Sequence, residues 1–187
     1  IIELCRHLNL DFFQGDENDL VDRYYKCAKK FNFENIIRVT SDCPLMDPNL
    51  VDEGISRFLD EKCDYLTNST GKFPHGVDFS IFTFSMLEKT WKNARLLSEK
   101  EHVIPYMEKK ENKFNTIFLK NQSDQSKFRI TLDWTEDLEL LRILVDKIKS
   151  RPILVHDVTT YLENNPNLLK INQGHHKEEG YLKSLKN

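Results

Sequence analysis

Several features that mark common functional classes are scarce or missing in this sequence of 187 residues. It has six glycines, and none of them belongs to a cluster that would cradle a phosphate group. No apolar run approaches the roughly 18 residues that a membrane-spanning helix requires. No secretory signal peptide of the usual three-part form is present. These absences predict no membrane partner and a cytoplasmic location.

Charge and cysteine usage remove further classes. The formal net charge of -3 gives no general attraction to nucleic acid, so we expect no nucleic-acid partner. The four cysteines form no Cys-x-x-Cys pair and have no histidine nearby at a zinc-site interval, which predicts reduced thiols. With 39% hydrophobic residues, the chain is long enough for one globular domain with a sizeable core.

Strand-like and helix-like segments alternate along the chain. Strands are expected at residues 11–16, 35–42, 63–69, 77–84, 113–120 and 127–134. Helices are expected at residues 1–10, 18–32, 47–62, 85–95, 98–110, 135–148 and 156–166. This alternation predicts an α/β fold with a mainly parallel sheet covered on both faces. Residues 1–150 are expected to form the α/β body, and 151–187 a C-terminal helix and polar tail of the same domain.

Two of the expected strands end on an acid that is followed at once by a helix-start signal. "IIRVTSD" ends at Asp42, and "RITLD" ends at Asp133. Because the carboxyl ends of parallel strands lie along one edge of a sheet, these two acids can converge there. Two carboxylates with room for water and phosphate suit Mg²⁺. The alternative is that each acid is a helix cap or a solvated turn residue.

Other acids fit simple helix-start roles. Asp47 directly precedes Pro48, which is a common helix opening. Asn18 or Asp19 is expected to cap the second helix, and Thr135 the helix that follows Asp133. The helix dipole favours Glu136 and Asp137 in that first turn.

Four segments resemble successive motifs of the cytidylyltransferase family: "RVTSDCPLMDPNLVDEGI", "FPHGVDFSIFTFSMLEKTW", "SEKEHVIPYM" and "FRITLDWTEDLELLRIL". The resemblance is to the spore coat polysaccharide biosynthesis branch, which is related to acylneuraminate and 3-deoxy-manno-octulosonate cytidylyltransferases. It implies a three-layer, Rossmann-like nucleotide-diphosphosugar-transferase fold. It also implies transfer of CMP from CTP to a sugar acceptor with release of pyrophosphate, with Mg²⁺ as cofactor, in surface or coat polysaccharide biosynthesis.

The resemblance assigns metal binding to Asp42 and Asp133, in agreement with the argument from strand ends. Arg38 and Arg129 are candidates for phosphate contacts, and Arg38 is included in the catalytic group. The alternative for each arginine is exposure to solvent or an ion pair.

Asp22 and Arg23 fall where related enzymes have a helix start near the nucleotide base. A solvated ion pair on the helix is the alternative reading of these two residues.

The segment "FPHGVDFSIF" is expected on the sugar side of the site. Gly76 permits a tight backbone, while His75 and Asp78 supply hydrogen bonds or an acid-base pair near the acceptor. The alternative is a polar hairpin before a strand.

Glu101 and His102 in "SEKEHVIPYM" are similar candidates for substrate binding. A capping box from Ser98 to Glu101 would account for the glutamate without any functional role.

Four aromatic or histidine side chains complete the candidates. Trp91 lies in an amphipathic helix and is expected to pack in the core, whereas Trp134 is better placed to line a pocket. His175 and His176 are able to bind metal, but adjacent histidines in a polar tail are more often incidental.

Related enzymes open with a strand and a basic loop of the form "QARxxSxRLPGK" around the triphosphate. The sequence shows no such segment, so we expect a fold that is incomplete at its N-terminal side. Three accounts remain open: part of a complete enzyme, a protein that binds nucleotide or sugar without catalysis, and a noncatalytic interaction module. A metal-dependent glycosyltransferase is a wider alternative. The resemblance also implies a homodimer formed through the segment around "FTFSMLEKTW".

Overall fold

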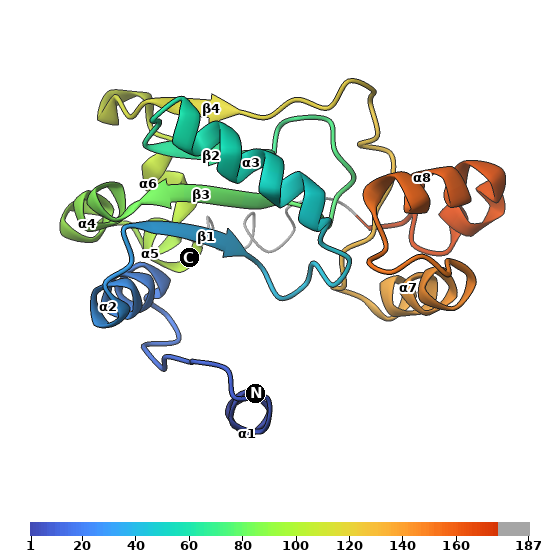
Figure 1. Ribbon diagram of the computed structural model, residues 1–187, viewed down its shortest axis with the longest axis horizontal. Coiled ribbons are helices and arrows are strands. Elements are labelled where there is room, and N and C mark those ends of the chain that lie inside the picture. Colours follow the sequence, from blue (N-terminus) through green and yellow to red (C-terminus); the bar gives the residue numbers. More distant parts are fainter. Residues whose placement is uncertain (176–187) are drawn as a thin grey trace. The chain divides into compact units, whose positions relative to one another are not determined.

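A computed structural model gives the structure of the chain and describes residues 1–175 (Figure 1). Within them the chain forms two compact units, one from residues 1–36 and 83–114 and the other from 37–82 and 115–175. The residues on either side of position 150 belong to the same unit. The expected division into an α/β body up to residue 150 and a C-terminal helix and tail after it stays a prediction. Among these residues no helix is long and apolar enough to cross a membrane.

The first unit is helical. Asp19, one of the two expected caps, accepts a hydrogen bond from the Asp22 backbone N–H at the start of the second helix. The elements of this unit are α1 (Ile2–His7), α2 (Leu20–Phe31), α4 (Phe84–Asn93), α5 (Leu97–His102), α6 (Ile104–Met107) and the 3-10 helix η1 (Lys110–Asn112).

Tyr25 on α2 packs this helix against α4. Its buried ring stacks on Phe84 and on Trp91 of α4, with centroid distances of 5.6 and 4.1 Å. Trp91 was expected in the core, but it is 38% exposed. One face of its indole is covered by Tyr25, and its Nε1 donates to Asp22 at 3.0 Å, which keeps the polar edge at the surface.

The helix expected over residues 98–110 is broken into α5 and α6. Val103 lies between them with a φ of 67°, outside the helical region. Pro105 follows at the start of α6, and proline has no N–H with which to continue the hydrogen bonds of a preceding helix. The expected capping box from Ser98 to Glu101 is also wrong, because Glu99 accepts the hydrogen bonds from the backbone at residues 95 and 96.

Within residues 1–175 the sheet has four strands, in the order β1-β3-β2-β4. They are β1 (Asn35–Val39), β2 (Tyr65–Thr67), β3 (Phe79–Thr83) and β4 (Thr116–Phe118). β2 runs antiparallel to β3 and parallel to β4. The α/β class is therefore confirmed, but the sheet is mixed and not mainly parallel. The loop between β2 and β3 carries no helix, and a parallel connection would need a longer crossover.

Two expected strands do not form. Among the described residues, 11–16 have no strand pairing, and 127–134 contribute only an isolated parallel bridge between Arg129 and His75. The next residue of the partner segment, Gly76, has a φ of +110°, which lies outside the range of a β-strand, so the pairing does not continue as a ladder. Asp133 thus follows an extended segment and not a regular strand.

Helices and strands of the second unit enclose its hydrophobic core. The helices are α3 (Pro48–Asp60), α7 (Thr135–Lys147), α8 (Val155–Asn164) and the 3-10 helix η2 (Pro166–Lys170). Asp47 caps α3 as expected, whereas the cap position of α7 is Trp134 and not Thr135. Figure 1 shows α3 lying over the sheet and α7 beside α8. The side chains buried most fully include Leu66, Phe128, Ile130, Leu140, Leu144 and Leu162.

Replacing Gly54 by alanine tests how closely α3 packs on β3. A Cβ at this position would lie 2.6 Å from Cζ and 2.7 Å from Cε2 of the buried Phe79 ring, too close for a rigid aromatic side chain to accommodate. We expect the free energy of unfolding to fall by about 1–3 kcal/mol despite the better helix propensity of alanine. Urea denaturation measures the change. Glu53→Ala, at an exposed position of the same helix, is the control, and equal stability of the two variants would contradict close packing here.

Candidate active site

Backbone hydrogen bonds join three separate segments of the second unit. The His75 N–H donates to the Phe128 carbonyl at 2.9 Å, and the Ile130 N–H donates back to the His75 carbonyl at 2.7 Å. Two residues further on, the Leu132 N–H donates to the Asp42 carbonyl at 2.8 Å. The segments that carry Asp42 and Asp133 are therefore hydrogen-bonded to one another, while the expected convergence of their two carboxylates stays a prediction.

Gly76 allows one of these segments to approach closely. A Cβ on this residue would lie 2.4 Å from the Thr131 nitrogen and 2.5 Å from the Ile130 carbonyl carbon. Together with its positive φ, this restricts the position to glycine. The Gly76 N–H also donates to Oδ2 of Asp78 at 3.3 Å, which orients that carboxylate toward the turn.

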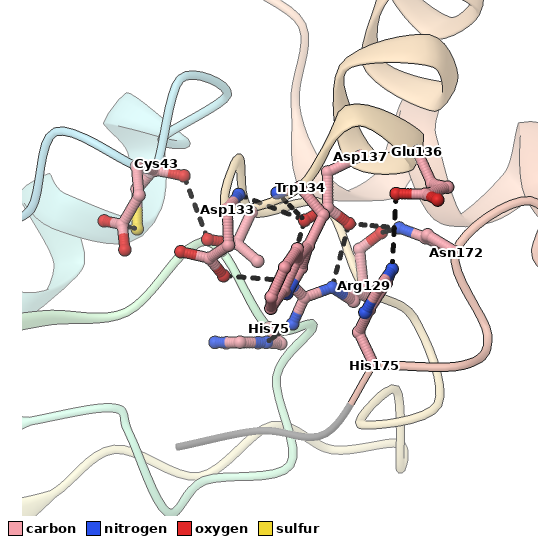
Figure 2. A network of polar contacts seen from close by, with 12 residues as sticks. Cys43, His75, Arg129, Asp133, Trp134, Glu136, Asp137, Asn172 and His175 are labelled. Carbon is pink, nitrogen blue, oxygen red and sulfur yellow. Dashed lines mark hydrogen bonds and ion pairs between the residues drawn. The ribbon is translucent and has the colours of Figure 1, made fainter. Parts of the chain in front are cut away.

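Arg129 lies at the centre of a polar network (Figure 2). Its Nε donates to Oδ1 of Asp137 at 2.8 Å, and its Nη2 donates to Oδ2 of Asp137 and to Oδ2 of Asp133, both at 2.7 Å. Its Nη1 lies 3.1 Å from Nδ1 of His75. The network thus draws together three of the residues singled out from the sequence, which are His75, Arg129 and Asp133.

Asp137 is the buried end of this network. Its side chain has no exposure to solvent, and it also accepts hydrogen bonds from Asn172 and from the backbone N–H groups of Asp133 and Trp134. Burial alone would raise the pKa of this carboxyl, but the hydrogen bonds from Arg129, Asn172 and the backbone outweigh it and lower the pKa to about 2. Asp137 is therefore a carboxylate at neutral pH.

Asp42 and Cys43 lie at the turn that follows β1. Cys43 Sγ lies 3.2 Å from Thr40 Oγ1 and 3.7 Å from Asp42 Oδ1. Burial raises the pKa of the Cys43 thiol to about 11, so this cysteine is not a thiolate nucleophile at neutral pH. Within residues 1–175, no cluster of three or more His, Cys, Asp or Glu side chains is arranged to hold a metal. A metal at this turn would therefore have at most two carboxylates as ligands.

A cavity of about 410 Å³ opens beside the network. Its walls include His75, Arg129, Asn172 and His175. The His175 ring stacks on Trp134 with a centroid distance of 4.8 Å, and its Nε2 lies 3.4 Å from Oε2 of Glu136. Trp134 thus supports one wall of the cavity through His175. His176 lies outside the described residues.

Arg38 has an unusual environment on β1. Its Nε is buried and finds no hydrogen-bond partner within the part of the chain that the structure describes. A buried donor without a partner is costly, and such groups call for an explanation such as a ligand.

Four of the candidate residues belong to the first unit and not to this network: Asp22, Arg23, Glu101 and His102. Asp22 forms a local ion pair with Lys26 at 2.7 Å, which matches the alternative reading of a helical ion pair. The binding roles of these four residues stay predictions.

Sequence reasoning missed the two buried members of the network. Asp137 was assigned only a helix-dipole role, and Asn172 was not singled out at all. Asn172 donates to Oδ1 of Asp137 at 2.8 Å across 35 residues of sequence. No local sequence pattern indicates a contact between residues so far apart. The position of Asp137, third in its helix, does indicate a carboxylate that accepts hydrogen bonds from the backbone at the helix start.

Comparison with known proteins gives a consistent result. Residues 3–165 match a family model described as Cytidylyltransferase. An uncharacterised protein of Methanocaldococcus jannaschii is 32% identical, covering 92% of this chain and 71% of the relative. The spore coat polysaccharide biosynthesis protein SpsF of Bacillus subtilis is 28% identical, covering 87% and 68% respectively. A solved cytidylyltransferase structure from Leptospira borgpetersenii superposes with a TM-score of 0.87 at 35% identity, covering 94% of this chain and 75% of that one.

Asp137→Asn tests the electrostatic role of the buried carboxylate. Because the folded-state pKa of about 2 lies below the ordinary value of 3.8, ionised Asp137 stabilises the fold above pH 3.8. This stabilisation is lost as the pH falls from 3.8 to about 2. We expect the difference in free energy of unfolding between wild type and variant to shrink by about 2 kcal/mol over that range. Urea denaturation at several pH values measures it. All other titrating groups are common to both proteins, so a difference that does not change with pH would contradict the assignment.

Proposed function

The chain belongs to the cytidylyltransferase family, and from this premise we propose that it transfers CMP from CTP to a sugar with release of pyrophosphate. The single observation that carries the proposal is the backbone hydrogen bond between Leu132 and Asp42, which joins the two acid-bearing turns. In nucleotidyl transfer the protein mainly positions the reactants and stabilises the charge on the phosphates. Two acids on adjoining turns suit that task, which needs no protein nucleophile.

Asp42 and Asp133 are the residues that would hold Mg²⁺. Their donor set fits this ion, because Mg²⁺ is usually held by one or two carboxylates while water and substrate phosphates complete its coordination. When bound, Mg²⁺ supplies charge neutralisation at the phosphate oxygens. Arg129 holds one oxygen of Asp133 at 2.7 Å and so fixes the direction in which the rest of that carboxylate points.

Arg38 is the residue that we assign to a phosphate oxygen. The assignment is supported by its buried Nε, whose missing partner a phosphate would supply. A guanidinium suits this role because its planar donors match phosphate geometry.

The cavity beside His75 and Arg129 is our candidate for the sugar acceptor. Its volume of about 410 Å³ falls in the range of small-molecule sites, and it adjoins the network that contains Asp133. Hydrogen-bonding side chains such as His75 and Asn172 on its walls suit the hydroxyl groups of a sugar. The similarity to SpsF supports a use of the product in surface polysaccharide synthesis.

Calorimetric titration with CTP and Mg²⁺ tests the metal-binding acids. We expect Mg²⁺ to strengthen CTP binding, and Asp42→Asn or Asp133→Asn to weaken the binding measured with Mg²⁺ at least about tenfold, since the loss of a metal-site carboxylate removes a ligand. Asp52→Asn, at an exposed position of α3, is the matched control and should bind as the wild type does. UTP and ATP test the base preference. A folded protein that binds no nucleotide would contradict the proposal and favour a noncatalytic interaction role.

Arg38→Met separates a role in binding from a role in stability. Methionine keeps most of the side-chain volume and removes the buried donor that lacks a partner. We therefore expect the free energy of unfolding to stay the same or rise by up to about 1 kcal/mol, while the affinity for CTP falls. Thermal denaturation and the same calorimetric titration measure the two effects. A clear loss of stability with unchanged CTP affinity would assign Arg38 to the fold instead.

A further inference from the structure

The hydrogen bonds of Arg129 leave little of its guanidinium for a substrate. Arginine has five N–H donors, and four of them are directed at Asp137, Asp133 and His75. The side chain is 10% exposed. A phosphate-binding arginine would instead present its planar edge to the ligand.

Asp137 holds this guanidinium in place. Its two oxygens accept from Nε and Nη2 of Arg129 at 2.8 and 2.7 Å, which is the paired geometry that fixes both the position and the plane of an arginine. The carboxylate is itself held by the N–H groups of Asp133 and Trp134 at 3.0 and 3.1 Å. The pair therefore has a single arrangement relative to the start of α7.

The same arginine determines which nitrogen of His75 carries a proton. Arginine stays protonated in proteins and cannot accept a hydrogen bond, so the 3.1 Å contact between Nη1 and Nδ1 requires Nδ1 to be the acceptor. The ring is then neutral with its proton on Nε2, and it serves as a hydrogen-bond donor and not as a general base through Nδ1.

We infer that Asp137 and Arg129 form a positioning unit, which holds the Asp133 carboxylate and the Nε2–H tautomer of His75 for the reaction. The inference rests on the proposed function for the meaning of Asp133, but the arrangement of His75 does not depend on it. Arg129 is then a positioning residue and not a phosphate ligand, which decides between the two readings that its sequence position allowed. A positive charge at position 129 is therefore not enough to hold Asp133 and His75 in place, because the planar guanidinium is also needed.

Nuclear magnetic resonance of protein with ¹⁵N-labelled histidine tests the inference without any substrate. The His75 signals are identified by their absence from His75→Gln. We expect wild type to show the Nε2–H tautomer alone, and Asp137→Asn and Arg129→Lys to show a mixture of tautomers. Lysine keeps the charge but has no fork to contact three partners at once. Asp157→Asn is the matched control, because Asp157 accepts from the Leu154 N–H at the start of α8 and has no contact with the network.

Titration with Mg²⁺ alone gives the second readout. Loss of an outer partner of a metal ligand typically lowers metal affinity 10- to 100-fold, so we expect at least about a tenfold loss in Asp137→Asn and Arg129→Lys and no change in Asp157→Asn. CTP affinity measured without metal should stay the same in all three. Circular dichroism shows whether each variant is folded. If Asp137→Asn does not fold, Arg129→Lys alone is used for the test.

The outcomes separate the inference from the function on which it rests. A wild-type Nδ1–H tautomer, or a tautomer unchanged in both network variants, overturns the positioning unit. If Arg129→Lys binds CTP more weakly than wild type without metal, and Asp137→Asn binds it as wild type does, the inference is overturned in favour of a phosphate contact by Arg129. If the His75 tautomer changes in Asp137→Asn but the protein binds neither Mg²⁺ nor CTP, the result supports the positioning unit and contradicts only the proposed function.

Discussion

The ion pair between Asp137 and Arg129 is the interaction on which the candidate site depends. Asp137 has no exposure to solvent, and its oxygens connect Arg129, Asn172 and the first turn of α7. A buried ion pair contributes little net stability in general, but removal of one partner leaves a buried charge at a cost of about 3–5 kcal/mol. Such a pair specifies an arrangement more than it stabilises the fold. Here the arrangement it specifies is that of Asp133 and His75.

The rest of the second unit places this ion pair next to the turns that carry Asp42 and Asp133. Phe128 and Ile130 are fully buried in the core, and they alternate with Arg129, whose side chain therefore points to the opposite side of the extended segment. Gly76 lets the neighbouring segment approach that backbone, and the Asp42 carbonyl holds its far end. Hydrophobic burial thus fixes the path of the chain, and the polar network fixes the side chains along it.

A site whose backbone is held by hydrophobic burial and whose side chains are held by a polar network suits nucleotidyl transfer. The reaction needs acids and donors held at fixed positions more than it needs a reactive nucleophile, and Cys43 beside the site is kept protonated by burial. The buried Nε of Arg38 and the cavity beside His75 add places for a phosphate and for a sugar. Each of these features lies in the second unit, so the site as we describe it is a property of that unit.

The sequence by itself determined the features that depend on neighbouring residues. These include the α/β class, the capped start of α3 at Asp47, a start of α2 capped at either Asn18 or Asp19, and the two acids that follow extended segments. Its motifs also identified the family. Only the tertiary structure decided that the sheet is mixed and that Asp137 pairs with both Arg129 and Asn172. Propensities and caps act within about one helical turn, whereas these contacts depend on the path of the whole chain, which no local pattern encodes.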